Sequence, residues 1–584
     1  MMCGLPVAPV RKAWRLCPPL PHASPLSRET GVTPLQAQLL FNRGILDPDS
    51  ARVFLSPTLS QMADPMEMKG IRSAVGTILG AVEHRRKVTV YGDYDADGLT
   101  ATALLWHFFA DLGVEADAYV PDRLTEGYGL NSAAIRRIAH NGTDLIITVD
   151  CGISALQETA LAMDLGMDMV VTDHHQIKGE ISHGCPVVNP HQPGCRFAFK
   201  GLAGVGVAFF LAVAVRSALR ERGWFTQQPE PDLRKLLDLV ALGTVADRVP
   251  LVGQNRILVK SGLRCMAQSR WPGIRALMGV SNVEGSEISS EDLAFRVAPR
   301  LNAPGRLGHA EDGLNILTVK ERVQAESLAR QLNRTNSRRQ KLEQEILSEI
   351  EKKAGQEALV GRRRTLLFGG ADWHQGVLGI VASRLVDRFH RPALVFNITD
   401  GVATGSGRSI DGFDLFKALG RNAHLFERFG GHAHAVGLRL ETGNLAAVEE
   451  GFEACACEML SDETLIPVIR VDARVGLDRV GPEFMEQVAE LAPFGEKNAE
   501  PVFMAGSVEV LDARVVGENH LKMRVRQGKT TLEAIGFRMG HMKPVRGACL
   551  HLLFSPEYNR WQGRDRLQLR LVDVRSSSAA IQFG

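Results

Sequence analysis

Hydrophobic and polar positions follow two different periods along the chain, and these periods divide it into parts. Over residues 71–315, short apolar runs such as Val88–Tyr91, Asp144–Asp150 and Met169–Thr172 alternate with longer stretches of helical period. This alternation predicts a parallel sheet covered by helices. The same kind of pattern returns over residues 361–462. We therefore predict an α/β protein with a parallel-sheet domain and a second, smaller α/β domain.

Two further patterns complete the division of the chain. Apolar residues recur at helical spacing over residues 316–353, around a basic, polar middle at Asn333–Lys341, so residues 316–360 are predicted to be one long connecting helix. From residue 463 to 576, apolar and basic residues alternate, as in Leu521–Arg526, which predicts a small β-domain with one charged face. Residues 1–70 are assigned to an arm with short helices, and residues 577–584 to a tail.

Acidic residues and histidines gather where the predicted strands and helices of the first domain end. The first strand runs into GDYDADG, DLIITVD ends in an aspartate, the third strand runs into Asp-His-His, and a later helix also ends in an aspartate. The group comprises Asp93, Asp95, Asp97, Asp150, His174, His175 and Asp247. Open α/β sheets bind their ligands at the carboxyl ends of the strands. We therefore expect these side chains to converge on one site.

The residue types in this group indicate a metal site. Clustered carboxylates repel one another unless cations neutralise them. Oxygen and imidazole ligands without thiolates favour Mn²⁺ or Mg²⁺, and one carboxylate could bridge two ions about 3.5–4 Å apart, as in two-metal phosphoryl-transfer sites. An EF-hand is excluded, because the twelfth position of its loop requires glutamate and Leu104 stands there. The sequence therefore predicts a two-ion site for phosphoester hydrolysis.

Composition restricts the remaining classes. The 584 residues carry a formal net charge of only +2, so contacts with nucleic acid must come from local patches. The nine cysteines show no zinc-binding spacing, which favours a reducing compartment. The N-terminal segment lacks the apolar core of a signal peptide, and the apolar run Val207–Val215 is too short to span a membrane. We expect a cytoplasmic protein with no membrane association.

Several motifs match one family. Asp173–His175 (DHH), together with GDYDADG, TVDCG and GTVAD, resembles the DHH phosphoesterase superfamily. PRLNAPGRLG (Pro299–Gly308), DWHQGVLGIVASRL (Asp372–Leu385), GSGRS and FGGHAHAVG are similar to motifs of the single-strand-specific DNA exonucleases within it. The resemblance runs from about residue 70 to the C-terminus. It implies a DHH domain, a DHH-associated nucleic-acid-binding domain and a C-terminal β-barrel with the OB-fold.

The same resemblance implies roles for the clustered residues. Asp150 would bridge the ions, Asp93 would lie in or beside the metal site, and His175 would face the scissile phosphate as donor or general acid. The implied ligands are Asp95, Asp97, Asp150, His174 and Asp247, and with His175 they form the predicted catalytic set.

Contacts with nucleic acid are predicted outside the metal site. Arg300, Asn302 and Arg306 lie in a predicted Pro/Gly-containing loop, where guanidinium groups would match phosphate geometry; structural pairing with acidic residues is the alternative. Two predicted glycine-rich loops and the charged face of the β-domain supply the other candidates. These are His374, Ser406, Arg408, Ser409, Gly431, His432, Lys522 and Arg524. Tyr558 and Trp561 are candidates for base stacking, and Phe537 is assigned to the barrel core.

By this resemblance, we expect a single-stranded-DNA-specific 5′→3′ exonuclease that releases 5′-mononucleotides in DNA recombination and repair. The implied cofactor is Mn²⁺ or Mg²⁺, and the implied partner is a single-stranded-DNA-binding protein; we expect a monomer. One alternative is a phosphodiesterase of short oligonucleotides or signalling nucleotides, but a dinucleotide needs neither the connecting helix nor the β-domain. The other is a non-catalytic DNA-binding scaffold, which would lack some of the ligands, and none is missing.

Overall fold

The computed structural model describes residues 12–578, apart from 22–25, 27–30, 124, 178, 183, 284, 286, 358–362 and 562–563. Most of the predicted tail, residues 579–584, lies outside this range. The chain forms two compact units. The larger unit comprises Cys17–Thr335 and Val471–Ala580, and the smaller unit is built around Asn336–Arg470. Helix α15 (Arg322–Glu357) passes from the larger unit into the smaller one.

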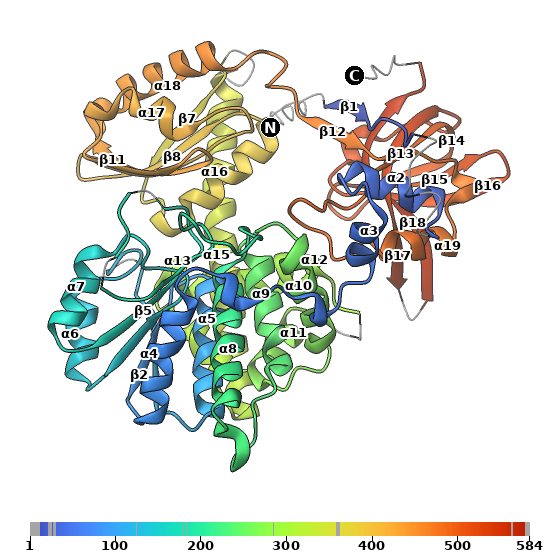
Figure 1. Cartoon of the computed structure of the whole chain (residues 1–584). Helices are drawn as coiled ribbons and strands as arrows, with labels where there is room; N and C mark the ends of the chain where they lie inside the picture. The colour runs from blue at the N-terminus through green and yellow to red at the C-terminus, as the bar shows by residue number, and fades with distance from the viewer. Residues whose placement is uncertain are drawn as a thin grey trace. The chain divides into compact units, whose positions relative to one another are not determined.

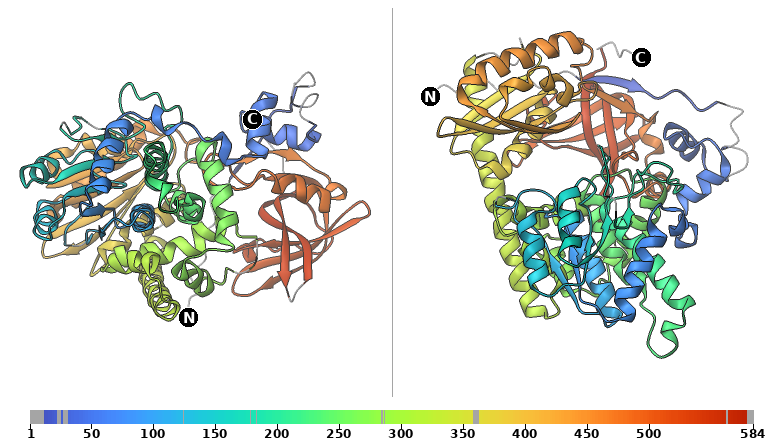
Figure 2. Two further views of the ribbon diagram at one scale, coloured as in Figure 1. Left: turned by 60° about the horizontal axis from the view of Figure 1, so that its bottom comes forward. Right: turned by 60° about the vertical axis from the view of Figure 1, so that its left-hand side comes forward.

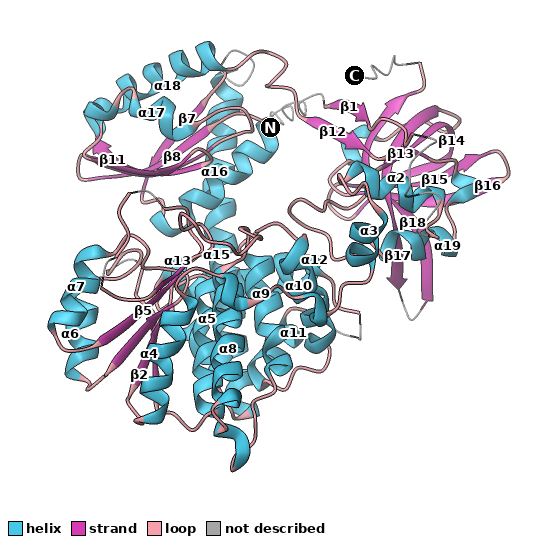
Figure 3. Ribbon diagram, viewed as in Figure 1, coloured by secondary structure: helices cyan, strands magenta, loops and turns pink. Residues whose placement is uncertain are grey.

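A five-stranded parallel sheet lies at the centre of the larger unit's first domain (Figures 1 and 3). Its order is β3-β2-β4-β5-β6, and every neighbouring pair is parallel. The strands are β2 (Val88–Tyr91), β3 (Ala116–Tyr119), β4 (Leu145–Thr148), β5 (Asp168–Thr172) and β6 (Val187–Val188). β2 and β4 are buried along their whole length, because helices cover both faces, and they therefore consist almost entirely of apolar residues.

The two faces of this sheet have separate cores. Ile146 packs with α6 (Ser132–His140) and α7 (Leu156–Asp164), whereas Ile147 packs with α4 (Ile71–Glu83), α5 (Ala96–Asp111) and α8 (Gly204–Glu221). Successive side chains of a strand point to opposite faces, so neighbouring residues serve different cores. The two views in Figure 2 show the sheet between these groups of helices. The further helices are α9 (Leu237–Ala246), α10 (Gly253–Met266), α11 (Pro272–Val280), α12 (Ser290–Asp292), α13 (Ala298–Leu307) and α14 (Glu311–Thr318).

The C-terminal part of the larger unit is a five-stranded β-barrel, with the two-residue strand β13 added at the edge of the same sheet. Its order is β13-β14-β15-β16-β18-β17, and an additional pairing of β14 with β17 closes it. The strands are β13 (Ala473–Arg474), β14 (Phe503–Val516), β15 (His520–Gln527), β16 (Thr530–Gly536), β17 (Cys549–Trp561) and β18 (Arg564–Ser576), with helix α19 (Pro482–Ala489). Closure leaves the barrel few unpaired strand edges.

The N-terminal helices belong to the barrel domain (Figure 1). α2 (Pro34–Asn42) and α3 (Pro48–Leu55) bury Leu40 and Phe54 in one core with Phe503 and Phe554 of the barrel. Asn42 strengthens the contact, because its side-chain amide donates hydrogen bonds to Asp472. Helices distant in sequence from the barrel strands therefore complete this domain. The short strand β1 (Ala13–Leu16) belongs to the smaller unit and pairs with β12 (Val468–Val471), whose first three residues belong to that unit too.

A five-stranded mixed sheet organises the smaller unit. Its order is β10-β11-β9-β8-β7, with β7 parallel to β8 and the other pairs antiparallel. The strands are β7 (Leu366–Ala371), β8 (Ala393–Thr399), β9 (Val402–Arg408), β10 (Arg428–His432) and β11 (Ala435–Glu441). Helix α16 (Gln375–Phe389) covers one face, and α17 (Leu415–Gly420) with α18 (Leu445–Met459) covers the other (Figures 1 and 3).

The predicted connecting helix differs in one respect. Residues 316–318 belong to α14, and Val319 leaves the helical conformation with ψ 135° before α15 begins at Arg322. The predicted long connecting helix is confirmed, but its predicted start at residue 316 was wrong, because apolar spacing continues across this break in the backbone. Among the described residues, no helix is long and apolar enough to cross a membrane.

Candidate metal centre

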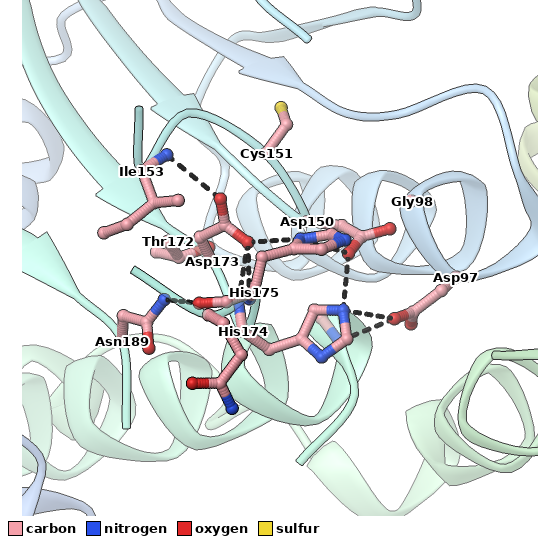
Figure 4. A network of polar contacts seen from close by, with 12 residues as sticks. Asp97, Gly98, Asp150, Cys151, Ile153, Thr172, Asp173, His174, His175 and Asn189 are labelled. Atoms are coloured by element: carbon pink, nitrogen blue, oxygen red, sulfur yellow. Dashed lines mark hydrogen bonds and ion pairs between the residues drawn. The ribbon is translucent and has the colours of Figure 1, made fainter. Parts of the chain in front are cut away.

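The acidic residues and histidines converge at the carboxyl end of the parallel sheet, as the sequence predicted. Figure 4 shows Asp97, Asp150 and the His174–His175 pair close together, contributed by α5 and by the segments that follow β4 and β5. The His174 Nε2 atom lies 3.0 Å from Asp150 Oδ1, 3.7 Å from Asp247 Oδ2 and 3.9 Å from Asp97 Oδ2. One imidazole nitrogen therefore faces three carboxylates.

The start of α5 fixes two of the three aspartates of the first motif, Asp95 and Asp97. Asp95 is the N-cap residue, and its Oδ1 accepts hydrogen bonds from the N–H groups of Asp97 and Gly98 at 2.9 and 3.1 Å. The remaining N–H of this turn, on Ala96, donates to Asn302 Oδ1 at 2.7 Å. A helix leaves its first N–H groups without intrahelical partners, so these bonds set both the helix start and the direction of the carboxylates.

Asp97 is held by the N-terminus of α8. Its two carboxylate oxygens accept hydrogen bonds from the N–H groups of Gly204 and Val205 at 2.6 and 2.8 Å. A helix N-terminus favours a negative charge, which offsets part of the repulsion from neighbouring carboxylates. Gly204 also has to be glycine, because a Cβ there would lie 2.6 Å from Asp150 Cβ. One helix start therefore positions two members of the cluster.

His175 is oriented by Asp173, a residue that sequence reasoning did not assign to the site. Asp173 Oδ1 accepts hydrogen bonds from His175 Nδ1 at 2.7 Å and from the N–H groups of His174 and His175 at 2.7 and 3.0 Å (Figure 4). Its Oδ2 accepts from Ile153 N–H at 3.0 Å. The buried Asn189 donates to the His175 carbonyl at 3.0 Å. Asp173 therefore fixes the direction of the His175 ring and leaves its Nε2 for other contacts, while Asn189 holds the backbone of His175.

The cluster fits divalent cations. Its ligand atoms form three overlapping groups, each within 4.8 Å: Asp93, Asp95 and Asp150; Asp97, His174 and Asp247; and Asp150, His174 and His175. Asp93 Oδ1, Asp150 Oδ1 and His174 Nε2 are buried and make no well-aligned hydrogen bond, although the last two lie 3.0 Å apart. Buried polar atoms are almost always satisfied, so this group of atoms is suited to bind cations. Carboxylate oxygens with one imidazole suit Mn²⁺ or Mg²⁺.

The electrostatics of the cluster without cations lead to the same conclusion. Burial raises the pKa of Asp150 well above its usual value, and the negative charges of Asp97 and Asp95 raise it further. Burial also raises the pKa of Asp93 and of Asp247. Burial opposes the charged form of His174, yet Asp247 and the other carboxylates raise its pKa overall. The site thus attracts positive charge from any source, protons included.

The residues predicted to contact nucleic acid near this site lie in a helix. Arg300, Asn302 and Arg306 all belong to α13, so the predicted loop was wrong; Pro299 stands in the first turn, where proline fits a helix. Arg300 donates to Asn333 Oδ1 at 2.9 Å and to the Val280 carbonyl at 3.1 Å. Asn302 Oδ1 accepts a hydrogen bond from the Ala96 N–H, between Asp95 and Asp97. These two side chains therefore have structural partners within the protein.

The glycine-rich segments of the smaller unit are strands instead of the predicted loops. Ser406 and Arg408 lie in β9, and Gly431 and His432 lie in β10. The glycines allow close packing: a Cβ at Gly405 would lie 2.3 Å from the Phe396 ring. Alternation places Ser406 and Arg408 on the opposite face.

Two further candidates of the smaller unit have partners of their own. His374 caps α16, where its Nδ1 accepts from Gly376 N–H at 3.1 Å, and the Ser409 hydroxyl donates to the Phe413 carbonyl at 2.7 Å. Their contacts with nucleic acid remain predictions.

The charged face of the barrel is largely neutralised. Leu521, Met523 and Val525 of β15 are buried, and Lys522 and Arg524 alternate with them on the outside, as predicted. Lys522 Nζ, however, lies 2.9 Å from Glu533 Oε2, and Arg524 stands opposite Glu533 in the strand register.

The predicted aromatic residues of the barrel have different outcomes. Phe537 is 55% exposed, so its assignment to the barrel core was wrong; it lies beyond the end of β16, outside the strand alternation. Tyr558 is 40% exposed, and the Trp561 side chain lies outside the described residues.

This fold and site define a DHH-type phosphoesterase. Residues 87–244 match the DHH family N-terminal domain, residues 358–457 the DHHA1 domain and residues 471–573 the RecJ OB domain. The chain is 38% identical to the single-stranded-DNA-specific exonuclease RecJ of Bacillus subtilis over 94% of this chain and 69% of that protein. It is 36% identical to RecJ of Escherichia coli K12, and the match covers 93% of this chain and 96% of that protein.

A solved structure shows the same likeness. RecJ from Thermus thermophilus in complex with Mn²⁺ superimposes with a TM-score of 0.82 at 29% identity, covering 97% of this chain and 80% of that one. The same protein has also been solved in complex with Mg²⁺. The chain belongs to the RecJ family.

Asn302 provides a test of how the segment Asp95–Asp97, which carries two of the clustered carboxylates, is held in place. Asn302→Leu is expected to weaken activation by Mn²⁺ about 10–100-fold, because the Ala96 N–H loses its acceptor and the carboxylates on either side lose their fixed direction. Asn302→Asp keeps an acceptor oxygen and should recover most of the affinity. Titrating activity with Mn²⁺ measures both. Equal losses in the two variants would show that the hydrogen bond is unimportant.

Proposed function

We propose that this protein is a metal-dependent exonuclease that degrades single-stranded DNA from the 5′ end and releases 5′-mononucleotides. The observation that supports this most strongly is the set of overlapping ligand groups joined by Asp150 and His174. One carboxylate shared between two groups is the arrangement that holds a pair of ions. Specificity for a single strand comes from the family to which the chain belongs.

The residues have distinct proposed roles. Asp93 and Asp95 would hold one ion, Asp97, His174 and Asp247 would hold a second, and Asp150 would contact both. Bound ions would lower the pKa of a water molecule and neutralise the charge that develops on the phosphate.

The protein's own groups orient the reactants. The Asp173–His175 hydrogen bond fixes the ring, so that Nε2 can donate a proton or a hydrogen bond to the phosphodiester. The helix starts at Asp95 and Gly204 keep the carboxylates in place before substrate binds.

A labelled substrate tests the activity, direction and strand preference together. A 5′-labelled single strand and its duplex would be incubated with purified protein and Mn²⁺ or Mg²⁺. We expect labelled mononucleotide to appear first, and only from the single strand. Cleavage of a dinucleotide but not of a long strand would instead support a phosphodiesterase of short oligonucleotides, and release from the 3′ end would contradict the direction.

The cellular setting is also a proposal. Family membership supports a cytoplasmic monomer that acts in recombination and repair beside a single-stranded-DNA-binding protein. Light scattering of the purified protein measures the oligomeric state, and a pull-down with the cognate single-strand-binding protein tests the partnership.

A further inference from the structure

A groove outside the metal centre lies between α11 and the first turns of α15. It encloses a cavity of about 560 Å³ in the larger unit, and its lining includes Arg275 and Val280 on one wall and Arg322, Glu326 and Arg330 on the other. A cavity of this size is in the usual range for ligand sites. None of these residues belongs to the acidic cluster described above.

The two helices run side by side in the same direction. At one end, a Cβ on Gly273 would lie 1.6 Å from the Ile316 carbonyl oxygen, so the start of α11 packs against the end of α14, just before α15 begins. At the other end, Arg300 donates to both the Val280 carbonyl and Asn333. With a rise of about 1.5 Å per residue, the eight residues from Arg322 to Arg330 give the groove a length of about 12 Å.

The groove carries a surplus of positive charge. Arg322 pairs with Glu326 at 2.8 Å on the helix surface, which leaves two guanidinium groups in excess. Among the described residues, the side chains of Arg275 and Arg330 make no hydrogen bond or ion pair. Guanidinium groups bind phosphate oxygens through two parallel N–H groups. The groove is therefore suited to an anion with several phosphate groups.

The turn that follows α12 carries an exposed aromatic residue, and this turn contacts the end of α11. Phe295 is 76% exposed, the largest exposed fraction of any described aromatic side chain in the exposed class. It lies in a π-helical turn, Leu293–Val297, a conformation that often marks functional sites. The turn is tied to the end of α11, because the Ser281 hydroxyl donates to the Arg296 carbonyl at 3.3 Å. Exposure of an apolar ring to water is unfavourable, and such a ring can stack on a base of a bound strand.

Helix α13 connects the Val280 end of the groove to the metal centre. Arg300, in its first turn, contacts Val280, whereas Asn302 contacts Ala96 beside the clustered aspartates. Further along, Gly305 packs against Tyr94, where a Cβ would lie 2.9 Å from the carbonyl oxygen. The ten residues of α13 span about 15 Å. A strand whose end lies at the metals could therefore reach the groove within a few nucleotides.

We propose that the α11–α15 groove binds the backbone of single-stranded DNA beyond the nucleotides held at the metal centre, with Phe295 stacking on one base. This proposal rests on the proposed function, because it extends the path of the same substrate. Cationic grooves beside aromatic rings are the usual composition of single-strand binding surfaces. An acidic peptide would satisfy the arginines, but it would leave the exposed ring unexplained.

The test compares binding of a trinucleotide and of a strand of about 20 nucleotides, longer than one OB-fold covers. The Asp150→Asn protein serves as background, so that the DNA stays intact. Adding Arg275→Ala and Arg330→Ala should weaken binding of the long strand at least about fivefold at low salt. The slope of log K against log salt should become shallower by about 1.4, which is about 0.7 for each of the two lost phosphate contacts. The dissociation constant of the trinucleotide should stay unchanged, so its ratio to that of the long strand should fall.

Two single changes and one double control variant sharpen the test. Phe295→Ala should weaken binding of the long strand about tenfold and leave the salt slope unchanged, because stacking releases no counterions. Glu326→Gln should strengthen binding, because it removes the negative charge from the groove. Arg72→Ala with Arg136→Ala, two exposed arginines on α4 and α6, removes the same charge elsewhere and is the matched control.

The outcomes distinguish this proposal from the proposed function. Unchanged affinity and salt slope in the groove variants would overturn the groove assignment, as would equal losses in the control. Binding of a fluorescent poly-glutamate peptide that the groove variants abolish, with DNA binding unaffected, would assign the groove to an acidic protein partner. A wild-type protein that neither hydrolyses nor binds single strands would refute the proposed function itself.

Discussion

Asp150→Asn should abolish exonuclease activity, lowering the rate at least about 10³-fold, while binding of single-stranded DNA is retained. Asp150 belongs both to the ligand group of Asp93 and Asp95 and to the group of the two histidines. An amide has one acceptor oxygen and no negative charge, so it cannot neutralise two cations. The measurement is release of labelled nucleotide at saturating Mn²⁺, beside binding of the same strand.

Asparagine is the informative replacement because of the backbone at this position. Asp150 has φ 60°, in the left-handed region, where asparagine is tolerated and alanine is strained. Asp150→Ala would therefore mix a backbone effect with the loss of a ligand. Asp164→Asn, on the exposed side of α7, is the matched control and should keep full activity.

The same variant should be at least as stable as the wild type when no metal is present. Burial and the neighbouring carboxylates raise the pKa of Asp150, which means that its charge is unfavourable in the cation-free fold. Mn²⁺ should then raise the melting temperature of the wild type more than that of the variant, because the variant has lost binding energy. Unchanged hydrolysis by Asp150→Asn would show that Asp150 is not a ligand.

The sequence predicted the convergence of the acidic residues and histidines because these residues lie at or next to the ends of regular elements. Parallel strands put their carboxyl ends on one edge, so Asp93 and Asp150 had to lie close together once their strands were recognised. Asp173 also follows a strand, but its role in orienting His175 was not recognised, and Asn302 carried no comparable signal. Asn302 meets Ala96 across more than 200 residues, and its role depends on a tertiary contact that no local pattern encodes.

Glycine and proline misled sequence reasoning for a related reason. The glycines beside Ser406 and the prolines around Arg300 were interpreted as loop residues, yet they lie in a strand and a helix. Glycine also permits close packing of a strand on a bulky neighbour, and proline also suits the first turn of a helix, where Pro299 lies; Pro304 lies inside the same helix. Local residue type does not distinguish these uses; the partner across the fold does.

The barrel domain depended even more on distant partners. Its core includes Leu40 and Phe54, which the sequence placed in a separate N-terminal arm. Strand alternation located β15 correctly, but it could not show that an N-terminal helical segment completes the same core. The contacts that join this domain to the parallel-sheet domain are likewise invisible in the sequence, because residues far apart in the chain make them, among them the buried Arg256.

Arg256→Ala should destabilise the protein by about 4 kcal/mol or more, a loss that is exceptional for one substitution. Arg256, in α10, is 1% exposed. Its guanidinium donates to the carbonyl groups of Phe54, Leu491 and Ala492 at 2.7, 2.9 and 2.9 Å, and lies 3.8 Å from the centre of the Phe54 ring. It therefore joins the parallel-sheet domain to α3 and to the segment that follows α19.

The size of this effect follows from what the substitution leaves behind. Burial lowers the pKa of Arg256 to about 9, so the cation is desolvated and depends on these carbonyl groups. Alanine would leave the carbonyl groups unpaired and open a cavity, and both changes are costly. Arg256→Met would fill the cavity without donors, so the difference between the two variants measures the packing contribution.

Urea unfolding followed by circular dichroism measures the change in the free energy of unfolding. Arg264→Ala, an exposed arginine on the same helix, is the control and should change stability by less than about 0.5 kcal/mol. A second readout is domain-specific: limited proteolysis should cut the segment after α19 sooner in Arg256→Ala than in wild type, because that segment loses its anchor. A loss within the range of the control would show that the barrel domain is held to α10 by other contacts, such as the Leu251 N–H bond to the Glu496 carbonyl at 2.8 Å.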